Sequence, residues 1–246
     1  MNDQTTITPE WPAPARVRAA FTLRTGGVSA PPYDSLNLGA HVGDSPDAVK
    51  ENRRRVRASL RLPAEPAWLQ QVHGTDVADL DASVEPHGPA DAAVAHLGEH
   101  VCVIQVADCM PVLFAARDGS AVGAAHAGWR GLAAGVLEKT VRKLGVAPAD
   151  LLVWLGPTIG QANFEVGDDV RTAFIAEDVQ AASAFEANTH GRWQCDLYGL
   201  ARRRLARLGV GAIFGGAWCT YADAARFFSF RRDGQCGRMA ALIWLE

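Results

Sequence analysis

The chain has 246 residues, of which 48% are hydrophobic and 21% are charged, so it can bury one large core or two small ones. The formal net charge is −3 and no basic stripe runs along the sequence, which argues against a nucleic acid as partner. No apolar run approaches the roughly 18 residues that a membrane-spanning helix needs. The five cysteines include no Cys-x-x-Cys pair and suggest no disulfide framework, so we expect a cytoplasmic protein with no membrane partner.

The first 18 residues differ in character from the rest of the chain. They contain Pro9, Pro12 and Pro14 beside acidic residues, and they lack the apolar segment of a signal peptide. We therefore expect residues 1–18 to form a loose N-terminal arm. Residues 19–246 show no internal repeat and no linker, and we expect them to form a single catalytic domain.

Helix and strand signals alternate along this domain. Ser45 is a good N-cap, Pro46 suits the first helical position, and a stripe of Val49, Val56 and Leu60 predicts a helix. The other expected strands are strand-like runs over 68–72 and 101–106, a hairpin over 111–125, a buried strand over 151–155, and late strands over 211–218 and 240–245. The other expected helices are one over 132–144 that ends at Gly145, one that begins at Asp168 and Asp169, and one that is capped by Asp196 and closed by Gly209. This alternation predicts an α/β fold with helices packed on a mixed β-sheet.

The hairpin is informative because its register can be predicted. An Asp-Gly pair between two apolar runs favours a type I′ turn closed over residues 117–120. Partners across the hairpin then have residue numbers that sum to 237, so Cys109 lies opposite Gly128 and diagonal to His126. Pro111 has no N–H to donate, and we expect the pairing to fray there and free Cys109 to turn inward.

Three residues predict a metal site. Two imidazoles and one thiolate form a zinc ligand set that leaves the fourth tetrahedral position open, as catalytic zinc sites do. The candidates are His73 in Gln-Gln-Val-His-Gly, Cys109 in Ala-Asp-Cys-Met-Pro, and His126 in His-Ala-Gly-Trp-Arg-Gly. The hairpin brings Cys109 and His126 together, whereas the approach of His73 does not follow from the sequence. Two other interpretations stay open: packing roles for these side chains, or a nucleophilic Cys109 with His126 or His73 as its base.

A series of short segments, in order along almost the whole chain, resembles one known family. The segments are residues 21–29 (Phe-Thr-Leu-Arg-Thr-Gly-Gly-Val-Ser), 35–38 (Ser-Leu-Asn-Leu), 42–44 (Val-Gly-Asp), 51–53 (Glu-Asn-Arg), 71–74 (Gln-Val-His-Gly), 107–109 (Ala-Asp-Cys), 126–131 (His-Ala-Gly-Trp-Arg-Gly), 156–157 (Gly-Pro), 164–167 (Phe-Glu-Val-Gly), 219–220 (Cys-Thr), 227–234 (Phe-Phe-Ser-Phe-Arg-Arg-Asp-Gly) and 237–238 (Gly-Arg). Together they resemble the YfiH family of laccase-domain proteins, which are also labelled polyphenol oxidases, purine nucleoside phosphorylases and peptidoglycan editing factors.

The resemblance implies a three-layer α/β/α sandwich and a metal, usually taken as zinc, bound by His73, Cys109 and His126 at the active site. It also implies phosphorolysis of adenosine, inosine and methylthioadenosine to the free base and a ribose 1-phosphate, with adenosine deaminase as a companion activity. The expected partners are therefore purine nucleosides and phosphate, and we expect a monomer. The usual zinc-deaminase pattern, His-x-Glu followed by Pro-Cys-x-x-Cys, is absent from the sequence, so deamination would need a different arrangement of residues.

Phosphorolysis needs an anion site, and three residues in the matching segments are candidate contacts for phosphate or nucleoside: Arg24, Asn37 and Arg130. Arg130 lies at the expected start of a helix, where N–H groups and the helix dipole favour anions. For Arg24 and Arg130 a turn or a local contact is an equally simple role. Ser229, Arg231 and Arg238 near the C-terminus are weaker candidates for the anion site, and a surface salt bridge is the favoured role for them. Asp108 is expected to point away from Cys109 and to orient a helix end.

Two alternative functions stay open. The first is a copper-binding polyphenol oxidase, but a multicopper site needs on the order of ten imidazoles, whereas the chain has seven histidines. Copper nevertheless remains the alternative metal for a site of two histidines and one cysteine. The second is a cysteine hydrolase that edits peptidoglycan precursors with Cys109 as nucleophile. Metal content separates it from the phosphorylase, because a metal-bound thiolate is poorly available to attack a carbonyl.

Overall fold

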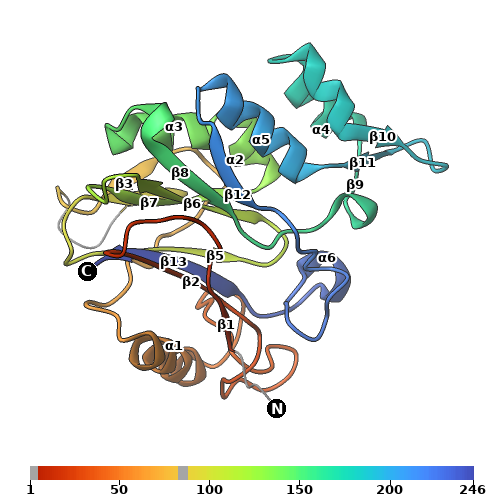
Figure 1. The fold of residues 1–246 in the computed structure, drawn as a ribbon. Helices are drawn as coiled ribbons and strands as arrows, with labels where there is room; N and C mark the ends of the chain where they lie inside the picture. Colours follow the sequence, from red (N-terminus) through yellow and green to blue (C-terminus); the bar gives the residue numbers. More distant parts are fainter. Residues whose placement is uncertain (1–4, 83–87) are drawn as a thin grey trace.

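The computed structural model describes residues 5–82 and 88–246, and its centre consists of two β-sheets that face each other (Figure 1). One is a six-stranded sheet with parallel and antiparallel pairs, whose strands in spatial order are β12 (Ala212–Gly215), β8 (Leu151–Leu155), β6 (Met110–Ala116), β7 (Val122–Ala127), β4 (Ala92–Ala95) and β3 (Val77–Asp79). The other is a four-stranded antiparallel sheet of β1 (Thr6–Ile7), β2 (Val17–Thr22), β13 (Met239–Leu245) and β5 (Val101–Val106). A small antiparallel sheet contains β10 (Phe185–Ala187), β11 (Trp193–Cys195) and β9 (Glu165–Val166).

Helices cover the outer faces of the two main sheets (Figure 1). The four-stranded sheet is covered by α1 (Pro46–Leu60). The six-stranded sheet is covered by α2 (Trp129–Ala134), α3 (Val136–Leu144) and α5 (Leu197–Arg207), with α4 (Asp168–Ile175) beside them. Short helical turns are α6 (Phe230–Asp233), η1 (Pro148–Asp150), η2 (Gln161–Asn163) and η3 (Val179–Ala184). The α/β class, the mixed sheet and the outer helices are confirmed, and the β-layer between the helices is made of two sheets.

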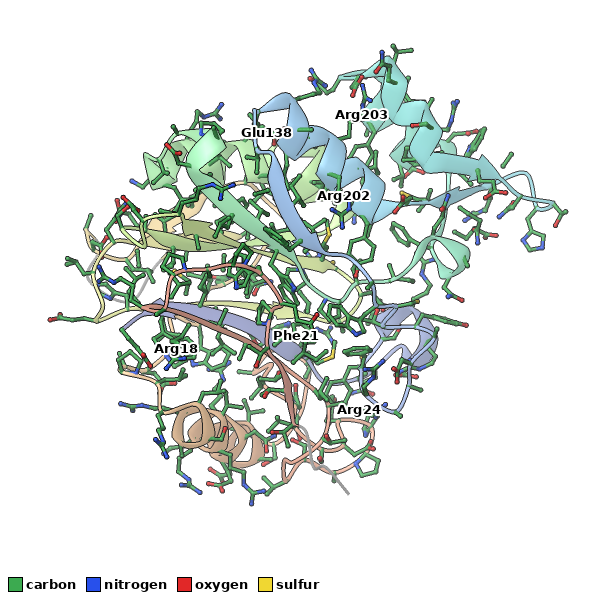
Figure 2. All side chains as sticks on the ribbon, viewed as in Figure 1. Arg18, Phe21, Arg24, Glu138, Arg202 and Arg203 are labelled. Atoms are coloured by element: carbon green, nitrogen blue, oxygen red, sulfur yellow. The ribbon has the colours of Figure 1, made fainter. Side chains whose placement is uncertain are left out.

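Alternation along β5 shows how one strand serves two cores. Cys102, Ile104 and Val106 belong to the apolar cluster between the two sheets, whereas Val101 and Val103 pack on the side of α1. Successive side chains of a strand point to opposite faces, so a strand covered on both faces is apolar throughout. A third cluster lies between the six-stranded sheet and its helices. In this layer Glu138 of α3, which is labelled in Figure 2, accepts a hydrogen bond from Arg204 of α5 at 2.7 Å.

Helix signals in the sequence predicted most boundaries. The hydroxyl of Ser45 accepts a hydrogen bond from the backbone N–H of Ala48, as expected of the N-cap of α1. The helix expected over 132–144 begins earlier, at Trp129, and is divided into α2 and α3. Gly135 has φ of 95° and caps both helices, because its left-handed backbone cannot continue a helix. The predicted end at Gly145 is confirmed.

Two segments differ from their expected structure. Within the expected arm, Thr6–Ile7 forms β1 and pairs with β2, while residues 1–4 lie outside the described residues. Residues 68–72 form no strand; within the described chain the segment has one isolated β-bridge, between Gln70 and Pro89. A single domain over 19–246 stays a prediction. No helix in the described part of the chain is both long and apolar enough to cross a membrane.

Candidate metal centre and its pocket

The hairpin of β6 and β7 positions two of the candidate ligands. Pro111 pairs with His126, which confirms the predicted register. Cys109 lies immediately before β6, which begins at Met110. The pairing does not fray at Pro111, contrary to expectation, because one further pair follows. The carbonyl of Pro111 accepts from the N–H of Gly156 and so points away from β7. The missing proline N–H lies on that same side and removes no bond between β6 and β7.

The turn of this hairpin is not the predicted type I′ turn. Such a turn requires positive φ at both central residues. Gly119 has φ of 74°, but Asp118 does not adopt positive φ. The carboxylate of Asp118 accepts from the N–H of Ser120 at 2.9 Å, which stabilises a four-residue loop instead. The register is unchanged because the loop closes between Ala116 and Ala121.

The three predicted ligands converge at one end of the hairpin. Sγ of Cys109 lies 3.9 Å from Nε2 of His73, and one ligand atom from each of His73, Cys109 and His126 lies within 4.8 Å of the other two. The two imidazole rings meet edge to face with centroids 4.8 Å apart. In a tetrahedral site with ordinary Zn–N and Zn–S bonds, ligand atoms are separated by about 3.6 Å. The group therefore fits a zinc ion with only small side-chain movements.

Asp91, which the sequence analysis missed, organises this group. Its buried carboxylate accepts from Nδ1 of His126 at 2.8 Å and from the N–H of His73 at 2.9 Å. It also accepts from the N–H groups of Val72 and Gly74 at 3.1 and 2.7 Å. A carboxylate at Nδ1 leaves Nε2 of His126 for a metal, the usual arrangement behind a ligand histidine. No motif marks Asp91, since it is a single acidic residue before an alanine-rich strand.

The charges of the site favour a thiolate. Burial raises the pKa of Cys109, but the charge and hydrogen bonds of His126, together with His73, outweigh it and lower this pKa to about 6. Burial lowers the pKa of His126, but Cys109 and Asp91 raise it to about 9. Burial also opposes ionisation of Asp91, and its hydrogen bonds from His126 and Gly74 keep its pKa below the usual value. Because thiolate is the metal-binding form of cysteine, this donor set is chemically suited to zinc.

The backbone around the ligands is shaped for close approach. His73 and Asp108 both have left-handed backbones, with φ of 59° and 81°. A Cβ atom on Gly128 would lie 2.8 Å from Sγ of Cys109 and 3.3 Å from the ring of His73. Glycine is therefore required at the third position of the His-Ala-Gly-Trp-Arg-Gly segment, where a side chain would fill the space between the ligands.

The three side chains lie on the wall of a pocket of about 320 Å³. Its other lining residues are His41, Gln71, Gln105, Val106, Ala107, Phe230 and Arg238. Among these described residues, Arg238 alone has a permanent positive charge. The pKa of His41 is lowered by burial and then by the positive charges of Arg238 and Arg53. The volume is at the lower end of the range for small-molecule sites.

Two of the predicted anion contacts lie outside the lining of this pocket. The guanidinium of Arg24 donates to the carbonyls of Asp34 and Ala224 at 3.1 and 3.0 Å, in the loop that follows β2 (Figure 2). Arg130 is exposed, and its guanidinium lies 4.4 Å from the ring centroid of Trp129. Both arginines are therefore occupied by local contacts in this structure.

Asn37, the third predicted contact, lies behind Arg238. It is fully buried, and its Oδ1 accepts from the backbone N–H of Arg238 at 2.8 Å. Its Nδ2 donates to Asp44 at 2.9 Å, which holds the amide in this orientation. Asn37 therefore positions Arg238, the one arginine among the described residues of the pocket lining. The sequence signal for Arg238 was its Gly-Arg segment, to which we gave less weight than to Arg130.

Asp108 orients the start of a helix, as expected for a neighbour of Cys109 whose side chain points the other way. Its carboxylate accepts from the backbone N–H of Arg231 and from the hydroxyl of Thr220, both at 2.6 Å. Arg231 lies in the first turn of α6, whose N-cap is Ser229. These contacts fix the position of Phe230, the first residue of α6, at the pocket.

Residues 18–246 match a family described as multi-copper polyphenol oxidoreductase laccase. The chain belongs to this family. A purine nucleoside phosphorylase of Pseudomonas aeruginosa is 55% identical over 241 residues, which cover 98% of each chain. The purine nucleoside phosphorylase YfiH of Escherichia coli is 54% identical over 240 residues, which cover 97% of this chain and 98% of that one. The resemblance to the YfiH family is thus confirmed.

Two solved structures share the fold over nearly the whole chain. A Neisseria meningitidis protein of the DUF152 family superposes with a TM-score of 0.95 at 48% identity and covers 99% of this chain and 100% of its own. YlmD of Geobacillus stearothermophilus superposes with a TM-score of 0.86 at 29% identity, covering 100% and 98%. The arrangement of two sheets and outer helices is therefore common to these proteins.

Proposed function

We propose that this protein is a purine nucleoside phosphorylase that binds zinc through His73, Cys109 and His126. It cleaves adenosine, inosine and methylthioadenosine with phosphate to the free base and a ribose 1-phosphate. The observation that supports this proposal is the convergence of the three side chains on a pocket, in a chain whose relatives are named purine nucleoside phosphorylases. Zinc suits a site with one thiolate, two imidazoles and an open position, and copper is the alternative metal for the same donors.

The reaction defines what the pocket must supply. A phosphate oxygen forms a bond to C1′ of the ribose while the bond from C1′ to N9 breaks, and the electron pair of that bond goes to the purine, which gains a proton. Positive charge develops on the ribose, so the phosphate must be held close by fixed donors. Bound zinc would supply Lewis-acid charge beside the reacting groups.

Arg238 is the residue that we assign to phosphate. Nη1 of its guanidinium donates to the carbonyls of Cys236 and Gly237 at 2.9 and 3.0 Å, which leaves Nε and Nη2 to donate to an anion in the pocket. Its backbone N–H is held by Asn37. His41 lines the same pocket and has a lowered pKa, so its imidazole is neutral near pH 7; it can accept a proton from the phosphate and, once protonated, pass it to the departing purine. We assign it to proton exchange with substrate. Arg24 and Arg130 remain alternative anion contacts.

Adenosine deamination is the proposed companion activity. It requires a water molecule activated near C6 of the purine, and a bound zinc ion lowers the pKa of water to about 7. The remainder of the proposal is a cytoplasmic protein that acts as a monomer on small molecules.

Two observations favour other functions for the same residues. The description of the family names copper and polyphenols, so copper at the same ligands with phenol oxidation is the second candidate. The lowered pKa of Cys109 beside His126 is also the pattern of an activated nucleophile, which would suit a cysteine hydrolase acting on peptidoglycan precursors. Metal content and product analysis distinguish these candidates from the phosphorylase.

The experiment combines elemental analysis of the purified protein with nucleoside cleavage in the presence and absence of phosphate. The proposal expects about one zinc per chain and base release that depends on phosphate and yields ribose 1-phosphate. Base release at an equal rate without phosphate would identify a hydrolase instead. Copper in equal amount to protein, with vigorous phenol oxidation, would support the oxidase.

Two arginine variants test the phosphate site. Arg238→Ala should lower turnover at limiting phosphate by roughly ten- to a hundredfold, since one charge-assisted contact is worth about 1.5–3 kcal/mol. Arg130→Ala is the matched comparison on the exposed surface. A large loss in Arg130→Ala with little change in Arg238→Ala would move the anion site to the start of α2.

A further inference from the structure

Gln105 lines the pocket, and its side-chain oxygen has no hydrogen-bond partner among the described residues. It lies near the end of β5, and the carboxamide of Gln71 satisfies its backbone: Gln71 accepts from the N–H of Gln105 at 2.8 Å and donates to its carbonyl at 2.9 Å. Gln105 is only 6% exposed, and its side-chain oxygen is buried and accepts no hydrogen bond from any described residue. A buried amide without a partner is destabilising and usually marks a place where something else binds.

Phe230 supplies a second, independent sign of a ligand in the same pocket. Its side chain lies at the start of α6 and is 58% exposed, although most aromatic residues of the chain are buried. The guanidinium of Arg238 lies 5.8 Å from its ring centroid. An exposed aromatic ring on a pocket wall provides a surface on which a flat heterocycle can stack.

We propose that Gln105 and Phe230 form the subsite for the purine base. Phe230 stacks on the face of the purine, and the carboxamide of Gln105 forms a hydrogen bond with the substituent at C6. This assignment rests on the proposed phosphorylase function and adds the determinant of base selection to it. In this orientation, which serves phosphorolysis, the metal-binding side chains and Arg238 are left for the ribose and phosphate, and deamination requires a second orientation with C6 at the metal.

A carboxamide in this position explains how one site accepts two kinds of purine. Its oxygen accepts a hydrogen bond from the 6-amino group of adenosine, and its NH₂ donates to the 6-oxo group of inosine. Rotation of the amide by half a turn exchanges the two atoms without a change in shape. Gln105 therefore permits both substrates, whereas a carboxylate, which only accepts, would favour the amino purine.

Equilibrium binding of adenosine and of inosine, measured by calorimetry at pH 8 without phosphate, tests the role of Gln105. Gln105→Glu should raise the preference for adenosine over inosine at least about tenfold, because the carboxylate repels the 6-oxo group. Gln105→Leu should weaken both nucleosides by roughly tenfold without changing their ratio. Gln70→Glu is the matched control, since Gln70 is exposed and lies outside the pocket lining. An unchanged preference in Gln105→Glu overturns the assignment.

Variants of Phe230 test the stacking role independently of Gln105. Because the Phe230 side chain is exposed, its substitution should not disturb the fold. Phe230→Ala should weaken both nucleosides by roughly tenfold, with zinc content unchanged, and Phe230→Trp should restore binding. Full binding by Phe230→Ala overturns the stacking role. If the unaltered protein neither binds nor cleaves any purine nucleoside, the proposed function itself fails. If it cleaves them normally while the Gln105 and Phe230 variants behave like the unaltered protein, only the base subsite is wrong.

Discussion

Asp91 connects the backbone geometry of the metal centre with its protonation. Its carboxylate accepts the N–H groups of three consecutive residues, 72–74, and this requires the left-handed φ of His73 in the middle of them. The same carboxylate holds the imidazole of His126. One buried acid therefore fixes the positions of two candidate metal ligands that are 53 positions apart in the sequence.

Substitution of the thiolate tests the ligand assignment. Cys109→Ala should lose most of its zinc, because the thiolate is the only anionic member of the set and its negative charge also stabilises the positive charge of His126. Zinc content after dialysis, measured by elemental analysis, reports the loss. Cys219→Ala is the matched control, because Cys219 is also half-buried but lies outside the pocket lining. Full zinc in Cys109→Ala would show that another group binds the metal.

Zinc binding should release protons in a manner set by the two perturbed pKa values. Between pH 6 and pH 9 the metal-free site holds a Cys109 thiolate and a protonated His126, since their pKa values are about 6 and about 9. Zinc needs the neutral imidazole, so binding at pH 7.5 should release at least one proton, from His126. Below pH 6 the thiol of Cys109 adds a further proton, and zinc affinity should fall more steeply with decreasing pH.

Calorimetry at pH 7.5 in buffers with different heats of protonation counts the released protons. In Asp91→Asn the pKa of His126 should fall, because the carboxylate that raises it is gone, and fewer protons should be released. Zinc binding without any proton release in the unaltered protein would show that His126 is already neutral.

The sequence predicted which site residues lie close together when they belong to one pair of hydrogen-bonded strands. It did not predict this for residues that come from separate segments. The hairpin register placed Cys109 near His126 from sequence alone, because antiparallel pairing is set by the turn and the apolar pattern. His73 joins them only through Asp91. Arg238 and Phe230 reach the pocket from the C-terminal part of the chain, a long-range approach that no local pattern encodes.

At the scale of the elements, helix limits were predictable from capping residues, and interruptions were less so. Gly145 was identified as a helix end because the apolar pattern stops there. Gly135 interrupts the same pattern without any change in polarity, so the break between α2 and α3 has no periodic signal. The four-residue α6 is too short to show a period at all, and it depends on Ser229 and Asp108 for its position.

Asp108 provides a test of how α6 is held. Asp108→Ala removes the carboxylate that accepts from Arg231 and Thr220, and it places a side chain that disfavours the left-handed backbone at φ of 81°. The expected loss of stability is about 3 kcal/mol or more. In a chain of this length that lowers Tm by roughly 6–12 °C.

Asp108→Asn is the matched variant for this test. Asparagine tolerates the left-handed backbone and keeps one accepting oxygen, so its loss should be about half that of alanine. Thermal unfolding followed by circular dichroism measures both. Equal destabilisation by Asn and Ala would show that the negative charge, and not the backbone conformation or the remaining hydrogen bond, is the dominant contribution.

At the scale of the whole molecule, the number of sheets was less predictable than the fold class. The alternation of strands and helices predicted an α/β protein, and the apolar runs over 101–106 and 240–245 predicted strands. A strand covered by a second sheet and a strand covered by helices have the same apolar pattern. The chain passes from β5 in one sheet to β6 in the other through residues 107–109, and Cys109 lies in that connection.

Metal removal should therefore weaken the contact between the two sheets. His126 belongs to the six-stranded sheet, and Cys109 lies in the connection between the sheets. The segment that carries His73 is hydrogen-bonded to β5 of the four-stranded sheet through Gln71. A ligand that binds only the folded state at a hundred times its Kd adds about 2.7 kcal/mol of stability. For a chain of this length, chelation of the zinc should lower Tm by roughly 5–10 °C. Scanning calorimetry before and after dialysis against a chelator measures the change, and Cys109→Ala should show almost none. An equal change in that variant would mean that the stabilising metal is bound elsewhere.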